Sequence, residues 1–275
     1  MCDTILQEQE IPTVTVERLP GITDEYQDPL RPAYELANCR KLAGTPVVVL
    51  IFLDDNESRW EKDEVLAFTE EHVLVGLDYL EKNAQKWGVE LDFVVESYAT
   101  SLSGYEIKYE GTVNPNLHNG GSTKDVLDHA AADIGCKDNW ELYSYYKSQY
   151  PNDDIIFLNF LNKPGISYTR NAISAGYLEY TEHCVLFADL LGGSSVRKDG
   201  SRASTIAHEI LHLFGAEDYY VTLSREILAN QAYPHDIMLW QYERIRENTL
   251  GDCTAYSVGW TDEAPAVCYD DRWWQ

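Results

Sequence analysis

The chain has 275 residues, of which 46 are acidic and 21 are Lys or Arg, so its formal net charge is −25 at pH 7. Hydrophobic residues make up 44% of the sequence, and 19 Tyr and 7 Trp exclude an overall disordered chain. The charge argues against nucleic-acid binding, because phosphate contacts need a basic face. No run of about 20 apolar residues is present, so the sequence predicts no membrane span.

The start of the chain, MCDTILQEQEIPTV, lacks a basic segment followed by an apolar one, so no signal peptide is visible. We therefore expect a cytoplasmic protein by default, or an exported one if a leader has been removed. The six cysteines form no CxxC pair. We expect reduced, buried thiols, with a Cys253–Cys268 bridge as the alternative in an oxidising compartment.

Hydrophobic periodicity predicts the secondary structure. Residues 1–44 hold several prolines and acids with little periodicity, so an extended N-terminal arm is expected there, followed by one domain over residues 45–275. The order of the strands and helices listed in the next sentence is typical of an α/β (α+β) domain with one central mixed sheet. The predicted elements are a strand at 45–55, a long backing helix at 62–88, a strand at 89–99, a helix at 122–135, a strand at 153–162, and one or two strands near the sheet edge within 175–191.

The segment STIAHEILHLFGAEDYY, residues 204–220, holds two histidines four residues apart. On a helix, His208 and His212 project from one face and can bind one metal ion. Glu209 can then reach a water on that metal without being a ligand itself. The alternative is an ordinary packing helix that carries this pattern by chance and binds no metal.

A third ligand is expected just after this helix. Gly215 follows His212 by three residues, and glycine tolerates the left-handed conformation in which helices often end. The chain can then bring a carboxylate back beneath the metal. Asp218 and Glu217 both lie at about the right distance, and a His2Asp set with one open position is typical of a catalytic zinc site.

The pattern HExxHxxGxxD over residues 208–218, followed by Met238 in the segment HDIMLW, resembles the metzincin clan of zinc metallopeptidases. Aspartate as the third ligand is similar to the snapalysin type. The resemblance implies a metzincin-like zincin fold, with an upper part at 45–215 and a small C-terminal subdomain at 216–275. It also favours Asp218 over Glu217 as the third ligand, and it makes Met238 the methionine of a Met-turn.

The resemblance further implies one zinc ion per chain and a zinc-dependent metalloendopeptidase. Such an enzyme hydrolyses peptide bonds with a zinc-activated water and, here, Glu209 as the general base. Tyr219, Tyr220 and Tyr242 are candidates for a donor to the oxyanion. Trp240 stands where some family members carry a tyrosine that acts on the metal or the oxyanion.

The expected partner is a peptide or protein substrate, and the protein itself is expected to be a monomer. Family members bind substrate as an extra strand along the sheet edge, which we place at residues 177–189. An alternative function is a catalytically inactive, zinc-containing protein that binds peptides or glycopeptides. Substitution of Glu209 would distinguish the two, because only hydrolysis depends on a general base.

Overall fold

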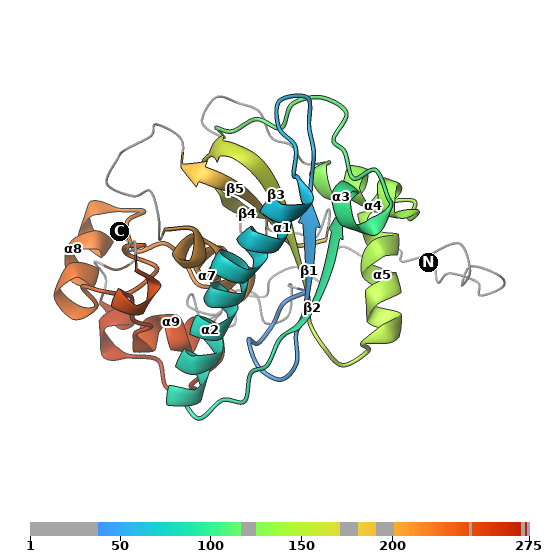
Figure 1. Ribbon diagram of the computed structural model, residues 1–275. Coiled ribbons are helices and arrows are strands. Elements are labelled where there is room, and N and C mark those ends of the chain that lie inside the picture. Colours follow the sequence, from blue (N-terminus) through green and yellow to red (C-terminus); the bar gives the residue numbers. More distant parts are fainter. Residues whose placement is uncertain are drawn as a thin grey trace, which may run out of the picture.

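The computed structural model describes residues 38–116, 125–170, 181–190, 201–241, 244–270 and 273. They form a mixed α/β fold, in which a five-stranded sheet lies between two layers of helices (Figure 1). The sheet order is β2-β1-β3-β5-β4, and only β4 runs antiparallel to its neighbour. The strands are β1 (Val47–Phe52), β2 (Val94–Ala99), β3 (Ile155–Gly165), β4 (Tyr168–Arg170) and β5 (His183–Leu190).

The helices divide between the two faces of the sheet. α1, η2, α2 and α7 cover one face together with the C-terminal part of the chain, and α4 and α5 cover the other. The elements are α1 (Lys62–Phe68), the π-helical turn η2 (Thr69–Val73), α2 (Leu74–Lys86), α3 (Thr100–Ser103), α4 (Val126–Ile134), α5 (Asn139–Gln149), α7 (Ser201–Leu213), α8 (Leu223–Ala232), η4 (Ile245–Glu247), α9 (Asp252–Ser257) and η5 (Ala266–Tyr269).

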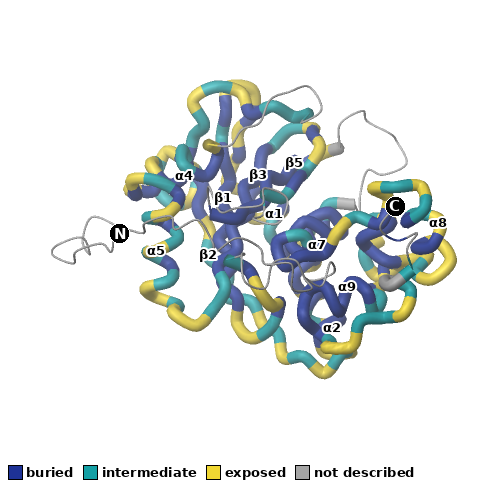
Figure 2. The backbone as a smooth tube through the Cα atoms, turned by 180° about the vertical axis from the view of Figure 1, so that it is seen from behind, coloured by how far each residue is buried: buried dark blue, intermediate teal, exposed yellow. Residues whose placement is uncertain are grey.

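The central strand β1 is buried along its whole length. Its side chains alternate between two cores, because successive residues of a strand point to opposite faces of the sheet. Val48, Leu50 and Phe52 pack with α1, α2 and α7, whereas the residues between them pack with α4 and α5. This explains the unbroken apolar run in the sequence, which is typical of a strand covered on both faces. Figure 2 shows the resulting buried interior around β1, β3 and α7.

Most predicted elements are confirmed. β1, β2 and α4 lie within the ranges predicted for them, β3 runs three residues beyond its predicted end, and the predicted backing helix is α1, η2 and α2 in continuous succession. Three α-helices of the described residues, α3, α5 and α8, were not predicted. In α5, tyrosines and polar residues are mixed around the helix, so no apolar face stands out in the sequence.

The predicted sheet edge at 177–189 is wrong for the part of it that the structure describes, residues 181–189. β5 pairs with β3 on one side and with β4 on the other, so it lies inside the sheet. After β3 the chain turns back antiparallel on the outer side of β5, and the edge is therefore β4 (Tyr168–Arg170). Three residues are too few to show periodicity in a sequence.

The end of the predicted arm packs onto the domain. Cys39 and Leu42 are buried, the Leu42 amide donates to the Val258 carbonyl (3.1 Å), and the Trp260 indole donates to the Leu42 carbonyl (2.6 Å). Residues 38–44 are thus held by the C-terminal part of the chain, and residues 1–37 lie outside the described residues. Within the described ranges, no helix has both the length and the apolar character needed to cross a bilayer.

The cysteines fall into two groups. Cys39, Cys136 and Cys184 are buried and are not disulfide-bonded, as the sequence predicts for reduced cysteines. Cys253, at the start of α9, is instead disulfide-bonded. A disulfide here restrains the C-terminal part of the chain, which carries the segment that packs beneath α7.

Candidate metal centre

The helix α7 (Ser201–Leu213) carries the two histidines and lies between the sheet and the C-terminal part of the chain. Its apolar side chains Ile206 and Ile210 are buried in the core that it shares with α2. A Cβ atom at Gly76 of α2 would be 3.0 Å from the Ala203 carbonyl oxygen, so glycine there allows the two helices to lie close together. This packing fixes α7 against the sheet and leaves its other face to the candidate site.

The end of α7 redirects the chain toward that face. Gly215 has φ +96°, a left-handed conformation that glycine adopts without strain. The Gly215 amide donates to the His212 carbonyl and the Ala216 amide to the Leu211 carbonyl, each at 3.1 Å, which is the pattern of a Schellman motif. The chain reverses here and brings Asp218 back beneath the helix, as the sequence predicts from Gly215.

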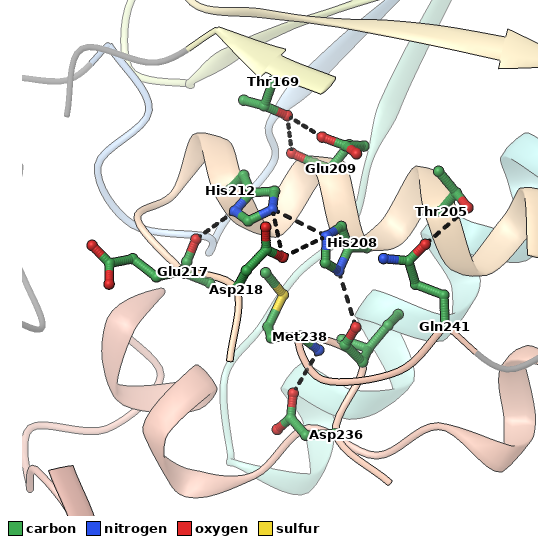
Figure 3. A network of polar contacts seen from close by, with 12 residues as sticks. Thr169, Thr205, His208, Glu209, His212, Glu217, Asp218, Asp236, Met238 and Gln241 are labelled. Atoms are coloured by element: carbon green, nitrogen blue, oxygen red, sulfur yellow. Dashed lines mark hydrogen bonds and ion pairs between the residues drawn. The ribbon is translucent and has the colours of Figure 1, made fainter. Parts of the chain in front are cut away.

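Three side chains converge at this place (Figure 3). The Nε2 atoms of His208 and His212 are 3.0 Å apart, and Asp218 Oδ1 lies 3.1 Å from the first and 3.3 Å from the second. Zinc bonds of about 2.0–2.1 Å at tetrahedral angles place ligand atoms about 3.3 Å apart. The three atoms therefore have the size of one face of a tetrahedral zinc site.

The outer nitrogens of both rings are held by the backbone. His208 Nδ1 donates to the Ile237 carbonyl (2.9 Å), and His212 Nδ1 donates to the Ala216 carbonyl (2.6 Å). A carbonyl only accepts, so Nδ1 carries the proton in each ring and Nε2 carries a lone pair when the ring is neutral. Backbone contacts of this kind are typical of zinc-ligating histidines, because they fix the tautomer and the ring orientation.

The cluster sets a buried carboxylate against two imidazoles. Asp218 Oδ1 is buried and lies within ion-pair distance of both Nε2 atoms. Burial lowers the pKa of His212, but the adjacent Asp218 carboxylate raises it more, to about 9. Burial likewise opposes ionisation of Asp218, but the two imidazoles hold its pKa far below the usual range. Once His212 loses its Nε2 proton, two lone pairs and a carboxylate oxygen face one point, and this arrangement suits a bound cation.

Glu209 lies beside this cluster and is buried. The Thr169 hydroxyl, on β4, lies 2.8 Å from Glu209 Oε2 and also 2.8 Å from the Glu209 carbonyl oxygen. The Cys184 thiol donates to the same carbonyl at 3.5 Å. The edge strand thus holds the carboxylate of Glu209 in place. This contact could not be predicted from the sequence, because Thr169 and Glu209 are 40 positions apart.

The competing carboxylate of Glu217 has a different partner. Its Oε2 pairs with Arg225 at 2.7 Å, and Arg225 also donates to the Asp218 carbonyl at 3.4 Å. Arg225 in turn donates to the Trp273 carbonyl (2.7 Å), which anchors it in the C-terminal part of the chain. Glu217 therefore lies in an ion pair beside the cluster, and Asp218 is the carboxylate that meets the histidines.

The three candidate tyrosines have different surroundings. Tyr219 is buried with its ring 5.0 Å from Trp273, and its hydroxyl bonds to that of Thr254 (2.7 Å), so it serves packing. Tyr220 follows Asp218 by two residues; burial, and then the Asp218 charge, raise the pKa of its hydroxyl. Tyr242 lies outside the described residues.

The predicted methionine turn lies below the side chains of His208, His212 and Asp218 (Figure 3). Met238 is fully buried, and its carbonyl accepts from the Tyr219 amide at 3.0 Å, which joins the turn to the segment that carries Asp218. Asp236 orders this turn: it accepts from the amides of Met238 (2.8 Å) and Gly251 (2.7 Å). Burial raises the pKa of Asp236 to about 6.

Trp240 occupies the position where the family resemblance suggests a tyrosine. Among the described hydrogen bonds, none joins its indole to His208, His212 or Asp218. Its indole Nε1 donates instead to Asn230 Oδ1 on α8, at 3.4 Å.

Searches with models of known protein families and among curated proteins find no match to this chain. The case for a function therefore rests on the residues of the site.

Proposed function

We propose that this protein is a zinc-dependent metalloendopeptidase with a metzincin-like fold. The observation that carries the proposal is the convergence of His208, His212 and Asp218 on one point, with the Glu209 carboxylate beside it. The three ligand atoms have the spacing of a zinc site, and three protein ligands leave a fourth position open, as catalytic zinc sites do.

The two imidazoles and Asp218 would hold one zinc ion per chain. When bound, zinc lowers the pKa of water toward neutrality and polarises a carbonyl group. The donor set suits this metal, because imidazole nitrogen and carboxylate oxygen are common zinc ligands and Asp218 supplies one negative charge against two on the ion. Neutralisation of the buried Asp218 carboxylate by the ion contributes to the binding free energy.

Glu209 acts as the general base in this proposal. It accepts a proton from the attacking water and passes it to the amine that leaves. The Thr169 hydroxyl, 2.8 Å from Glu209 Oε2, orients the carboxylate for both transfers. Of the two described tyrosines, Tyr220 is the better candidate to donate to the developing oxyanion, because the Asp218 charge acts on its hydroxyl whereas the Tyr219 hydroxyl is bonded to Thr254.

A cleavage assay with a peptide library tests the proposal. The zinc-loaded wild-type protein is incubated with the library, and mass spectrometry identifies new termini. Glu209→Gln keeps the size of the side chain and removes the base, so we expect it to retain zinc and to lose at least about a hundredfold in rate. If the wild-type protein holds zinc and, like Glu209→Gln, produces no new termini, the alternative function is favoured: a zinc-containing protein that binds peptides without cleaving them.

A further inference from the structure

The third proposed metal ligand is held differently from the first two. His208 and His212 belong to α7, so the helix itself fixes their positions relative to each other. Asp218 lies beyond the end of that helix, in a segment without regular secondary structure. Distances between a metal and its ligands tolerate deviations of only about 0.2 Å. The position of Asp218 therefore depends on the contacts that its segment makes with other parts of the chain.

Arg225, on α8, joins this segment to Trp273. Its guanidinium Nη1 donates to Glu217 Oε2 at 2.7 Å and to the Asp218 carbonyl at 3.4 Å. Its Nε donates to the Trp273 carbonyl at 2.7 Å. The carbon atom at the centre of the guanidinium also lies 5.7 Å from the centroid of the Trp273 ring. One buried cation thus holds two backbone carbonyls from distant parts of the chain.

Trp273 packs against the same segment from the side opposite the histidines. It is fully buried, and its ring lies 5.0 Å from that of Tyr219. Glu217 and Tyr219 line one small cavity together with Arg225 and Trp273. Figure 3 shows the Glu217 side chain pointing away from the two imidazoles and that of Asp218 pointing toward them. The segment therefore lies between the metal cluster and Trp273, with its side chains directed alternately to the two sides.

The guanidinium of Arg225 is suited to fixing a backbone position. Its donors have fixed directions in one plane, so contacts to two carbonyls define where each of them lies. The side chain of Arg225 is only 7% exposed, whereas that of Glu217 is 46% exposed. Loss of the Glu217 carboxylate would let water reach that side of the cation and would leave both carbonyl contacts in place. The two carbonyl contacts, rather than the ion pair, connect Trp273 with Asp218.

We propose that Arg225 is a positioning residue of the metal centre, which couples the packing of Trp273 to the position of the Asp218 carboxylate. Zinc is bound tightly only while Trp273 packs against Tyr219 and Arg225. This deepens the proposed function, on which it rests for the metal and its ligands. It adds to the site two residues that lie outside the HExxHxxGxxD motif.

A double-mutant cycle of zinc affinity tests the coupling. Zinc is titrated, in competition with a chromophoric chelator, into metal-free wild type, Arg225→Met, Trp273→Ala and the double variant. Each single substitution should weaken zinc binding by about tenfold, as the loss of contacts that orient a metal ligand does. The double variant should be no weaker than the single ones, because both substitutions break the same connection to Asp218. The visible spectrum of bound Co²⁺, which reports ligand geometry, should change alike in all three.

Two further variants separate positioning from general stability. Leu142→Ala, buried on α5 at the other face of the sheet, should lower the urea midpoint and leave zinc affinity unchanged. Trp273→Phe keeps an aromatic ring against Tyr219 and should recover most of the affinity that Trp273→Ala loses. The Trp273 variants leave the Arg225–Glu217 ion pair in place, so they test the coupling even where Arg225→Met does not fold.

The outcomes separate this inference from the proposed function. Zinc binding as tight as that of the wild type in Arg225→Met and Trp273→Ala overturns the positioning role alone. So does a loss that adds up in the double variant or that Leu142→Ala shares. Coupled losses of zinc affinity, without peptide cleavage by the wild type, support the positioning role and contradict the peptidase. A wild-type protein that binds no zinc contradicts both.

Discussion

The Thr169 hydroxyl lies 2.8 Å from Glu209 Oε2, across the contact between the edge strand β4 and the helix α7. One short strand thus presents both an open edge and a hydrogen-bond donor to the proposed general base. A peptide that pairs with β4 would lie next to the carboxylate that this strand orients. In the proposed function, the same three residues would therefore position both the substrate and the base.

Removal of this hydroxyl should slow the chemical step. Thr169→Val keeps the shape of the side chain but leaves Glu209 without its donor, so we expect kcat to fall by about tenfold or more with a smaller change in KM. Zinc content should not change, because Thr169 touches no ligand. Thr169→Ser restores the donor and should recover most of kcat. Equal losses in the two variants would mean that Thr169 acts only through packing.

Zinc binding should depend on Asp218 and not on its neighbour. We expect about one zinc per wild-type chain by plasma mass spectrometry, and an affinity more than about tenfold weaker in Asp218→Ala, because one of three ligands is lost. Glu217→Ala is the matched control: its carboxylate pairs with Arg225, so zinc content should stay near that of the wild type. Equal zinc in wild type and Asp218→Ala would remove the proposed ligand set.

Sequence and structure agree best where the site is local. His208 and His212 are one helical turn apart, and Gly215 indicates the reversal after the helix, so the three converging side chains could be expected within eleven residues; the choice of Asp218 over Glu217 came from the family resemblance. Thr169 could not, because its contact with Glu209 depends on β4, which is too short to be read from a pattern. The choice among the tyrosines also needed the structure, since Tyr219 and Tyr220 are adjacent in sequence but face opposite surroundings.

The fold follows the same rule. The continuous apolar run of β1 and the apolar residues at three- and four-residue spacing in α2 are the residues that are buried, so both elements could be predicted from the sequence. The order of strands in the sheet depends on where the chain returns after β3, and no residue pattern encodes that path. The placement of β5 inside the sheet, with β4 as its edge, therefore came from the structure alone.

Zinc binding should release a proton near neutral pH. In the metal-free protein the Asp218 carboxylate, working against burial, raises the pKa of His212 to about 9, so this imidazole is charged at pH 7. Zinc needs the neutral ring, and we expect affinity to rise by up to about tenfold per pH unit until about pH 9 and then to level off. Calorimetry in two buffers of different ionisation enthalpy should give about one proton per zinc at pH 7. Proton release near zero at that pH would contradict a charged His212.

The same proton should stabilise the metal-free fold. The folded pKa of His212 lies above its ordinary value of 6.5, so the stabilisation is fully present below about pH 6.5 and is lost as the pH rises through about 9. Zinc should remove this dependence, because the zinc-bound ring is neutral and the rise in zinc affinity offsets the lost stabilisation over the same pH range. Urea unfolding of metal-free and zinc-loaded protein between these pH values measures the difference directly.

Asp236 should be the strongest single support of the methionine turn. Its carboxylate is fully buried and accepts from two backbone amides, of Met238 at 2.8 Å and of Gly251 at 2.7 Å, and from the Thr254 hydroxyl at 3.0 Å. Asp236→Ala leaves both amides buried without an acceptor, at about 1–3 kcal/mol each, so we expect a loss of about 2–5 kcal/mol in the free energy of unfolding.

Urea unfolding of the metal-free variant measures this loss, with His235→Ala, an exposed neighbour, as the control that should change stability little. The loss should extend to the metal centre. The Met238 carbonyl accepts from the Tyr219 amide, and the Ile237 carbonyl accepts from His208 Nδ1. A loosened turn therefore no longer holds His208 and Asp218 in their positions relative to each other. Zinc affinity should therefore fall together with stability. A variant as stable as the wild type would mean that the turn keeps its shape through the packing of Met238 alone.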